Sequence, residues 1–172
     1  LQRDVSGDDN WIPYSGTQNI EVSSDYQTYE HVFKMKNDTD EQTILSISMG
    51  AVNGKRITDK HTVFIDNITL EETEEPKQSE KPVGDELIQN GDFTKGQENW
   101  ENAITAPGEA DVSFEDGRAV YQIKNVGTAD WNVQLKQSGL TLEKGSTYEL
   151  SFKVKSDKAR TIKAALLTET YD

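Results

Sequence analysis

The chain has 172 residues, of which 33% are apolar, so it can form one compact core whereas two independent cores would each be marginal. It carries 31 acidic and 18 basic residues, and the net charge of −13 argues against nucleic acid or an anionic lipid surface as a partner. The absence of cysteine excludes a disulfide framework and a thiolate metal site, and no apolar run approaches the roughly 20 residues that span a bilayer. We therefore expect one small soluble domain.

Short segments with alternating or continuous apolar residues follow one another along the chain, separated by Gly, Asn, Asp and Ser. This period of two indicates antiparallel strands, which we predict at 29–35, 43–49, 62–70, 119–123, 131–135, 147–154 and 161–167. Turns are predicted at Asn53-Gly54, Asp116-Gly117 and Lys144-Gly145, and the first two pairs favour positive φ. No segment has a long amphipathic helical pattern. The number and spacing of the strands predict an all-β fold, a jelly-roll or Greek-key β-sandwich of two antiparallel sheets.

The order of the parts is unusual. Strand 62–70 has the character of a closing edge strand, yet it lies in the first half of the chain. Residues 71–86 are acidic, contain proline and have few apolar residues, so they are predicted to form a solvated linker. A segment that reads as the opening strand of a domain, Glu86 to Phe93, comes only after this linker, and Trp100 follows it as an expected core residue.

Four motifs together resemble the β-sandwich carbohydrate-binding modules of families four, nine, sixteen and twenty-two, which have a galactose-binding-like fold. They are Asn90-Gly91-Asp92-Phe93, the segment from Trp131 to Leu135, the segment from Gly145 to Phe152, and the segment from Ile65 to Leu70. Read as 87–172 followed by 1–70, the chain resembles one complete module. In this interpretation 87–172 is the N-terminal half, 1–70 is the C-terminal half, and 71–86 links them. A circular permutation or a slice through two tandem modules would give this order.

Two strands show which face would point away from the core. In the strand after Arg160, one alternate set is apolar and suits the interior (Ile162, Ala164, Leu166), whereas the other is mixed and suits an exposed face (Lys163, Ala165, Leu167, Glu169, Tyr171). In the strand around residue 47, Leu45, Ile47 and Met49 would point inward and Ser46 and Ser48 outward. Small polar side chains with few aromatic ones are suited to a concave binding face.

The resemblance implies a carbohydrate-binding groove on this face. Aromatic rings stack on the C–H patches of a pyranose and amides bind its hydroxyls. The implied residues are Trp131 and Gln134 on one strand, Glu169 and Tyr171 at a strand end, Ser48 and Lys163 on neighbouring strands, and Trp11 and Tyr14 in the groove wall. Each has an alternative: Trp131 could fill the sandwich edge, and Gln134 could be an ordinary solvated residue. Ser48 departs from the longer amide or imidazole side chain that related modules often present.

The resemblance also implies a structural calcium ion, held by Asp92, the backbone carbonyl of Gly117, and Asp66. Oxygen ligands from distant segments suit Ca²⁺. Alternatively, the two carboxylates could cap turns. The two histidines, His31 and His61, lie in different predicted strands and give no zinc pattern.

By this resemblance the protein is a non-catalytic module that binds a polysaccharide chain and directs an attached glycoside hydrolase to it. A β-glucan is the first expectation, with xylan and mannan next. We expect a secreted, bacterial, extracellular protein; the start at Leu1 without a signal-peptide pattern indicates a mature or excised polypeptide. The alternatives are a structural or protein-binding sandwich, and a glycosidase, for which Glu169 is the only carboxylate assigned to the predicted face. A monomer is favoured over a dimer that exchanges halves.

Overall fold

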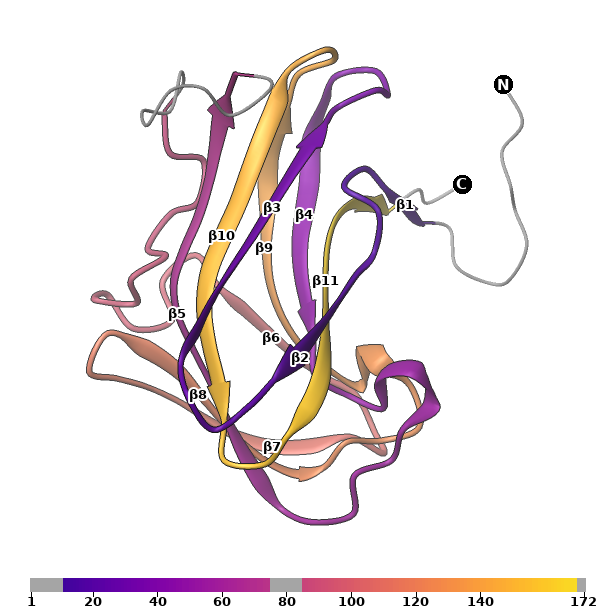
Figure 1. The fold of residues 1–172 in the computed structure, drawn as a ribbon, viewed down its shortest axis with the longest axis vertical. Helices are drawn as coiled ribbons and strands as arrows, with labels where there is room; N and C mark the ends of the chain where they lie inside the picture. The colour runs from indigo at the N-terminus through magenta and orange to yellow at the C-terminus, as the bar shows by residue number, and fades with distance from the viewer. Residues whose placement is uncertain (1–10, 75–84, 170–172) are drawn as a thin grey trace.

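Two antiparallel sheets face each other in the computed structural model, which describes residues 11–74 and 85–169 (Figure 1). In the first sheet, called sheet A here, hydrogen-bonded neighbours follow the order β1 (Trp11–Pro13), β11 (Arg160–Glu169), β4 (Asp40–Ser48), β9 (Val133–Leu142), β6 (Glu101–Ile104). A further strand, β2 (Gln18–Val22), also pairs with β11. The other, sheet B, has the order β3 (Gln27–Lys34), β10 (Thr147–Ser156), β5 (His61–Thr73), β8 (Arg118–Asn125), β7 (Glu109–Glu115). The predicted all-β sandwich is confirmed.

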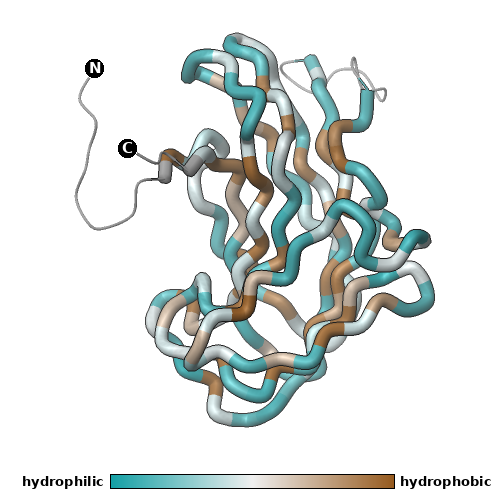
Figure 2. Tube along the Cα trace, turned by 180° about the vertical axis from the view of Figure 1, so that it is seen from behind, coloured by the Kyte–Doolittle hydropathy of each residue, from teal (hydrophilic) through white to brown (hydrophobic). Residues whose placement is uncertain are grey.

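The core lies between the sheets and is built from alternate residues of their strands, as the hydropathy along the strands in Figure 2 indicates. On sheet A the inward residues include Leu45, Ile47, Ile162 and Leu166, and all four are completely buried. Facing them from sheet B are apolar side chains of β5, β8 and β10. Burial of each such side chain stabilises the fold by about 1.5–3 kcal/mol, so the period of two in the sequence determines which face packs.

Each sheet contains strands from both described segments of the chain. In sheet A, β4 from the first segment lies between β11 and β9 from the second. In sheet B, β5 from the first segment lies between β10 and β8 from the second. The two segments therefore share one pair of sheets and one core.

The linker expected at 71–86 is shorter than predicted at both ends. Strand β5 continues to Thr73, and Glu71 to Thr73 pair with residues 147–149 of β10. At the other end, Leu87 donates its amide hydrogen to the carbonyl of Leu70 (2.9 Å), and Glu86 Oε1 accepts from the amides of Leu70 and Ile88 (both 2.8 Å). An acidic composition predicts unpaired chain, but a strand tolerates acidic side chains where they stay partly exposed. Residues 75–84 lie outside the described residues.

The segment expected as an opening strand, Glu86 to Phe93, is not a strand: it has no regular structure up to Ile88 and then bends and turns over residues 89–92. Asn90 organises these turns: its Nδ2 donates to two backbone carbonyls (both 2.9 Å) and its Oδ1 accepts from the amide of Lys95 (3.0 Å). The rings of Phe93 and Trp100 pack with centroids 5.3 Å apart, and Trp100 is only 5% exposed. The core role predicted for Trp100 is confirmed, whereas the strand is wrong because Asn90 satisfies the local backbone groups.

Two predicted turns are confirmed by their backbone angles. Asp116 and Gly117 both have positive φ (52° and 72°) and connect β7 to β8. Asn53 and Gly54 also have positive φ (54° and 71°), in the short 3₁₀ turn η1 (Val52–Gly54). Four strands were not predicted, namely β1, β2, β6 and β7. Within the described ranges, no helix is long and apolar enough to cross a membrane.

Candidate functional site

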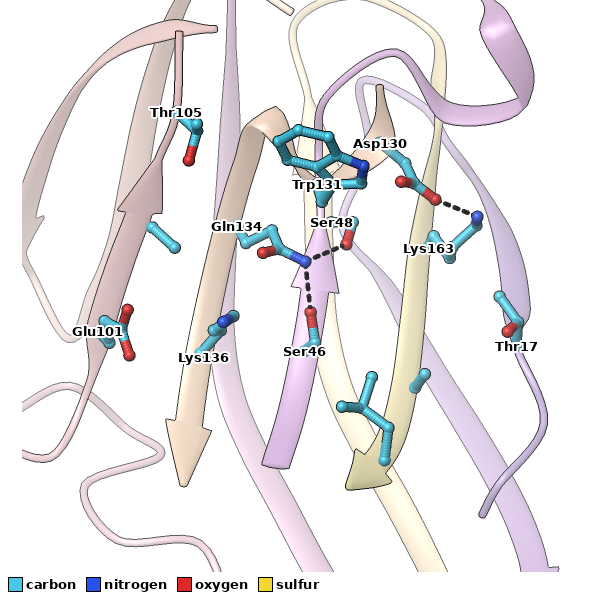
Figure 3. Close-up of a pocket in the computed structure, with 13 residues that line it drawn as sticks. Thr17, Ser46, Ser48, Glu101, Thr105, Asp130, Trp131, Gln134, Lys136 and Lys163 are labelled. Atoms are coloured by element: carbon cyan, nitrogen blue, oxygen red, sulfur yellow. Dashed lines mark hydrogen bonds and ion pairs between the residues drawn. The ribbon is translucent and has the colours of Figure 1, made fainter. Parts of the chain in front are cut away.

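A groove of about 720 Å³ lies on the outer face of sheet A (Figure 3). Strands β11, β4, β9 and β6 form its floor, and the 3₁₀ turn η2 (Asp130–Asn132) stands at one end. The lining residues are Thr17, Ser46, Ser48, Glu101, Ala103, Thr105, Asp130, Trp131, Gln134, Lys136, Lys163, Ala165 and Leu167. Four of the eight carbohydrate-binding candidates from the sequence are among them: Trp131, Gln134, Ser48 and Lys163.

The middle of the floor is a polar network on β9 and β4. Gln134 Nε2 donates to Ser46 Oγ (2.9 Å) and to Ser48 Oγ (3.0 Å), and Figure 3 shows both bonds. The two serines are almost completely buried although they belong to the outward set of β4, because the amide of Gln134 covers them. Since an amide nitrogen has only two hydrogens, this network leaves Oε1, an acceptor, as the group of Gln134 that a ligand can use.

Trp131 rises above this floor at one end of the groove. Its side chain is 47% exposed, which is unusual for an indole. The expectation that Trp131 begins a strand together with Gln134 is wrong: strand β9 starts at Val133, and Trp131 occupies the middle of η2. The turn, and not a strand, therefore holds the ring of Trp131 over the groove (Figure 3).

The turn that carries Trp131 is fixed by the buried side chain of Asn132. Its Oδ1 accepts from the amides of Thr128 and Ala129 (both 2.8 Å), and its Nδ2 donates to the carbonyl of Thr105 (3.0 Å). Gly127 lies so close that a Cβ there would be 2.4 Å from this Oδ1. The turn is therefore held before any ligand arrives, which lowers the entropic cost of binding.

A second clamp on the turn comes from the residues that follow β4. The amide of Gly50 donates to the carbonyl of Asp130 and the amide of Ala51 to that of Ala129, both at 2.9 Å. A Cβ on Gly50 would lie 2.2 Å from the oxygen of Ala129, so only glycine permits this approach. These two segments of the chain are thereby held side by side next to Trp131.

Charged side chains lie at both sides of the groove, and sequence reasoning missed most of them. Lys163 on β11 makes an ion pair with Asp130, and Glu101 on β6 lies directly opposite Lys136 on β9 in the strand register. The prediction that Glu169 is the only carboxylate on this face is therefore wrong. Asp130 was missed because it lies in a turn, and Glu101 because the four residues of β6 are too few to show a period. The lining residues that the structure describes include two lysines and two carboxylates, so their charges balance.

Of the remaining carbohydrate-binding candidates, the structure places the side chain of one, Tyr14, away from these four. Tyr14 is absent from the lining: its hydroxyl donates to Asp40 Oδ2 (3.0 Å) and its ring packs against the core. Burial, with the bond to Asp40, raises the pKa of Tyr14 to about 12. Trp11 and Glu169 are backbone partners where β1 meets β11. Tyr171 lies outside the described residues.

The expected calcium ligands belong to three segments that touch one another. The amide of Ile68, two residues after Asp66, donates to the carbonyl of Gly91, next to Asp92 (2.9 Å). A Cβ on Gly117 would lie 3.2 Å from the carbonyl oxygen of Asp92. The Oδ1 atom of Asp92 accepts from Thr94 N (3.2 Å) and Oγ1 (2.9 Å), and these bonds lower the pKa of Asp92. The backbone of these three segments is thus in contact, and the ligand types expected from them, carboxylate and carbonyl oxygens, are those that calcium accepts.

Among the described residues, no three or more His, Cys, Asp or Glu side chains are grouped as a metal site. The expected calcium ligands include only two such side chains, Asp92 and Asp66, with one backbone carbonyl, so they do not make a group of three.

Comparison with protein families identifies the fold. The model of the carbohydrate binding domain family that combines families 4 and 9 matches residues 85–172, just over half of the chain. The chain belongs to this family. The resemblance inferred from the sequence motifs is thereby confirmed for families 4 and 9 and for the motifs within 85–172. Searches of curated proteins and of solved structures gave no match. The matched part of this carbohydrate-binding module supplies Trp131, Gln134 and Lys163, whereas Ser46 and Ser48 come from the segment outside the match. Domains of such families are typically non-catalytic.

Proposed function

We propose that the groove on sheet A binds a single chain of a neutral polysaccharide, a β-glucan first, and xylan or mannan next. The observation that carries this proposal is the exposed indole of Trp131, held by a fixed turn above a polar floor. An indole of this kind provides a face for the C–H surface of a pyranose ring. The Oε1 atom of Gln134 accepts a hydrogen bond from a sugar hydroxyl.

Charge supports a neutral ligand. The lysines and carboxylates of the groove balance, and the whole chain carries −13. The negative net charge would repel a polyanionic glycan. Lys163 would not offset this repulsion, because it already makes an ion pair with Asp130. A neutral chain meets no such cost.

In its parent protein the module acts outside a bacterial cell and is non-catalytic. It keeps an attached glycoside hydrolase close to the polysaccharide, because a tethered enzyme has a high effective concentration at the surface to which its partner module binds. A groove suits a single soluble or amorphous polysaccharide chain, whereas a flat aromatic surface would suit the surface of a crystalline polysaccharide.

The test is a glycan array followed by calorimetry with cello-, xylo- and manno-oligosaccharides of defined length. We expect binding to at least one series, and binding weaker by about 30-fold or more for the Trp131→Ala variant. Absence of all glycan binding, with capture of a protein partner, would instead select a structural or protein-binding sandwich.

A glycosidase is tested in the same samples by measuring reducing ends. Glu101 and Asp130 both line the groove, but Asp130 already makes an ion pair with Lys163. A glycosidase needs one carboxyl group as acid and a second as nucleophile or base. We expect no release of reducing ends from any polysaccharide that binds.

We also propose that Asp92, the carbonyl of Gly117, and Asp66 hold a calcium ion with a structural role. Support comes from the contacts of Gly91 with Ile68 and of Gly117 with Asp92, which join the turn segment after the linker to β5 and to the β7–β8 turn. When bound, the ion would cross-link these three segments. The groove is formed by other residues, so the ion would not contact the glycan.

A further inference from the structure

Arg160, the first residue of β11, is a buried cation with an unusual set of partners. It is 4% exposed, and its guanidinium donates to the carbonyl of Met49, to the carbonyl of Gly50 (2.9 Å) and to His61 Nε2 (2.7 Å). Among the described residues it makes no ion pair with a carboxylate. Burial lowers the pKa of Arg160 to about 10, so it remains charged at neutral pH. A buried charge of this kind depends on every hydrogen bond it has.

The two carbonyls that Arg160 holds belong to the segment that clamps the Trp131 turn. Met49 and Gly50 use their amides to bind the carbonyls of Val133 (2.7 Å) and Asp130 (2.9 Å). Gly50 therefore has Arg160 on one side and the turn on the other, and Met49 has Arg160 on one side and the residue directly after the turn on the other. A displacement of Arg160 would move the clamp and, with it, the indole at the end of the groove.

His61 is the one side chain among the described residues that accepts a hydrogen bond from Arg160. A guanidinium only donates, so His61 Nε2 must carry the lone pair. Nδ1 then carries the hydrogen and donates to the carbonyl of Asp59 (2.9 Å). This arrangement requires a neutral imidazole: a proton on Nε2 would remove the acceptor and place a second cation against Arg160.

The surroundings of His61 oppose its protonation. Burial is the main cause that lowers the pKa of His61 below its ordinary value, and Arg160 and Lys158 act in the same direction. The carbonyl of Asp59 and the carboxylate of Asp157 act against it. Lys158 makes an ion pair with Asp59, and Asp157 Oδ1 accepts from the amide of Thr62 (2.8 Å), so both nearby acids already have partners.

We propose that Arg160 is a positioning residue for the Trp131 turn and that protonation of His61 releases it, which loosens the turn and weakens glycan binding in acid. The part that concerns glycan rests on the proposed function. The sign follows from linkage: because the folded state disfavours the proton, the structure is most stable above the ordinary histidine pKa of about 6.5 and loses stability as the pH falls below it.

The first test needs no glycan. Amide hydrogen exchange of Gly50 and Ala51 is measured by NMR between pH 7.5 and pH 5 as protection factors, in the wild type, in His61→Gln and in His31→Gln. Glutamine can accept from Arg160 but cannot gain a proton, and His31 is the only other histidine of the chain. We expect roughly fivefold or greater loss of protection in acid for the wild type and His31→Gln, and none for His61→Gln. A flat wild-type profile, or an equal loss in His61→Gln, would overturn the proposal.

The second test is calorimetry with cellohexaose on the same three proteins. We expect affinity to fall in acid for the wild type and His31→Gln but to stay constant for His61→Gln. If cellohexaose does not bind at any pH while the exchange profiles behave as stated, the positioning role of Arg160 is supported and the ligand assignment fails. If cellohexaose binds equally at pH 7.5 and pH 5 in the wild type, the proposal is overturned. Because His61→Gln keeps an acceptor for Arg160, the comparison does not depend on removing the buried arginine.

Discussion

Trp131 and Trp100 show how position separates two identical side chains into different roles. Trp131 is 47% exposed and lines the groove, whereas Trp100 is 5% exposed and packs on Phe93. We expect Trp131→Ala to weaken glycan binding by about 2 kcal/mol or more, roughly 30-fold, with little change in melting temperature. Trp100→Ala should instead lower the free energy of unfolding by about 3–5 kcal/mol. Calorimetry and thermal unfolding of both variants check this, and wild-type affinity in Trp131→Ala would remove that residue from the site.

Two glutamines on β9, Gln134 and Gln137, offer a matched comparison. Gln134 binds Ser46 and Ser48 in the groove, whereas Gln137 exchanges two hydrogen bonds with the backbone of Gln89 (both 2.8 Å). Gln134→Ala should reduce affinity by about 1–3 kcal/mol, since it removes an acceptor for the sugar. Gln137→Ala should reduce stability by a similar amount and leave the affinity of the folded fraction unchanged. Equal loss of affinity in both variants would contradict this separation.

At the scale of elements, the turn η2 decides the shape of the groove. Asn132 makes three hydrogen bonds that fix this turn, so Asn132→Ala leaves two amides and one carbonyl without their partner. We expect the variant to lose about 1–3 kcal/mol of stability and also to bind glycan more weakly, because Trp131 is no longer held in place. Asn37→Ala, at an exposed position in another turn, is the control and should change neither quantity. Normal affinity in folded Asn132→Ala would show that the turn does not need this side chain.

The same elements show what the sequence could and could not predict. Strands β4 and β11 carry a clear alternation, so the inward sets were predicted correctly, and Ser46, Ser48, Lys163, Ala165 and Leu167 of the predicted outward sets line the groove. The turn η2 was predicted as strand because its fold depends on Asn132 reaching Thr105, a contact that no local pattern indicates. Strand β6 is short, and its place in sheet A depends on pairing with β9. The resemblance implied a place for Tyr14 in the groove wall, whereas a distant partner, Asp40, holds its hydroxyl elsewhere.

Strand β5 gives a test of the proposed calcium ion. Its pairing with β10 is interrupted between Ser151 and Lys153, and Asn67 beside Asp66 has positive φ (49°), so the strand bulges where it meets the segment around Gly91. A chelator should lower the melting temperature of the wild type, since an ion that binds only the folded state stabilises it, by about 2.7 kcal/mol at 100 times Kd. Asp66→Ala should lose this response and Asp25→Ala, an exposed control, should keep it. An unchanged wild-type melting curve with no metal by elemental analysis would contradict the site.

At the scale of the whole molecule, each sheet has a strand of the first segment between strands of the second. The family match covers 85–172, but the strands of this part do not form continuous sheets by themselves: β4 separates β11 from β9, and β5 separates β10 from β8. Without β4 and β5, inner edges of both sheets would be exposed and the core would lack the apolar side chains of these two strands. We infer that the first segment completes the module, as expected for a circular permutation or for neighbouring halves of two tandem modules.

Completion within one chain is favoured by the distance that the linker must cover. Leu70 and Leu87, which flank the connection, share a backbone hydrogen bond of 2.9 Å. Because the ends of the connection are already in contact, closure in the same chain needs only a short loop, whereas exchange with a second chain adds the entropic cost of association. We expect light scattering to give the mass of one chain, 19.3 kDa, throughout a dilution series, with a single unfolding transition. A dimer that persists on dilution would show exchanged halves, and two separate transitions would mean that the segments do not share one core.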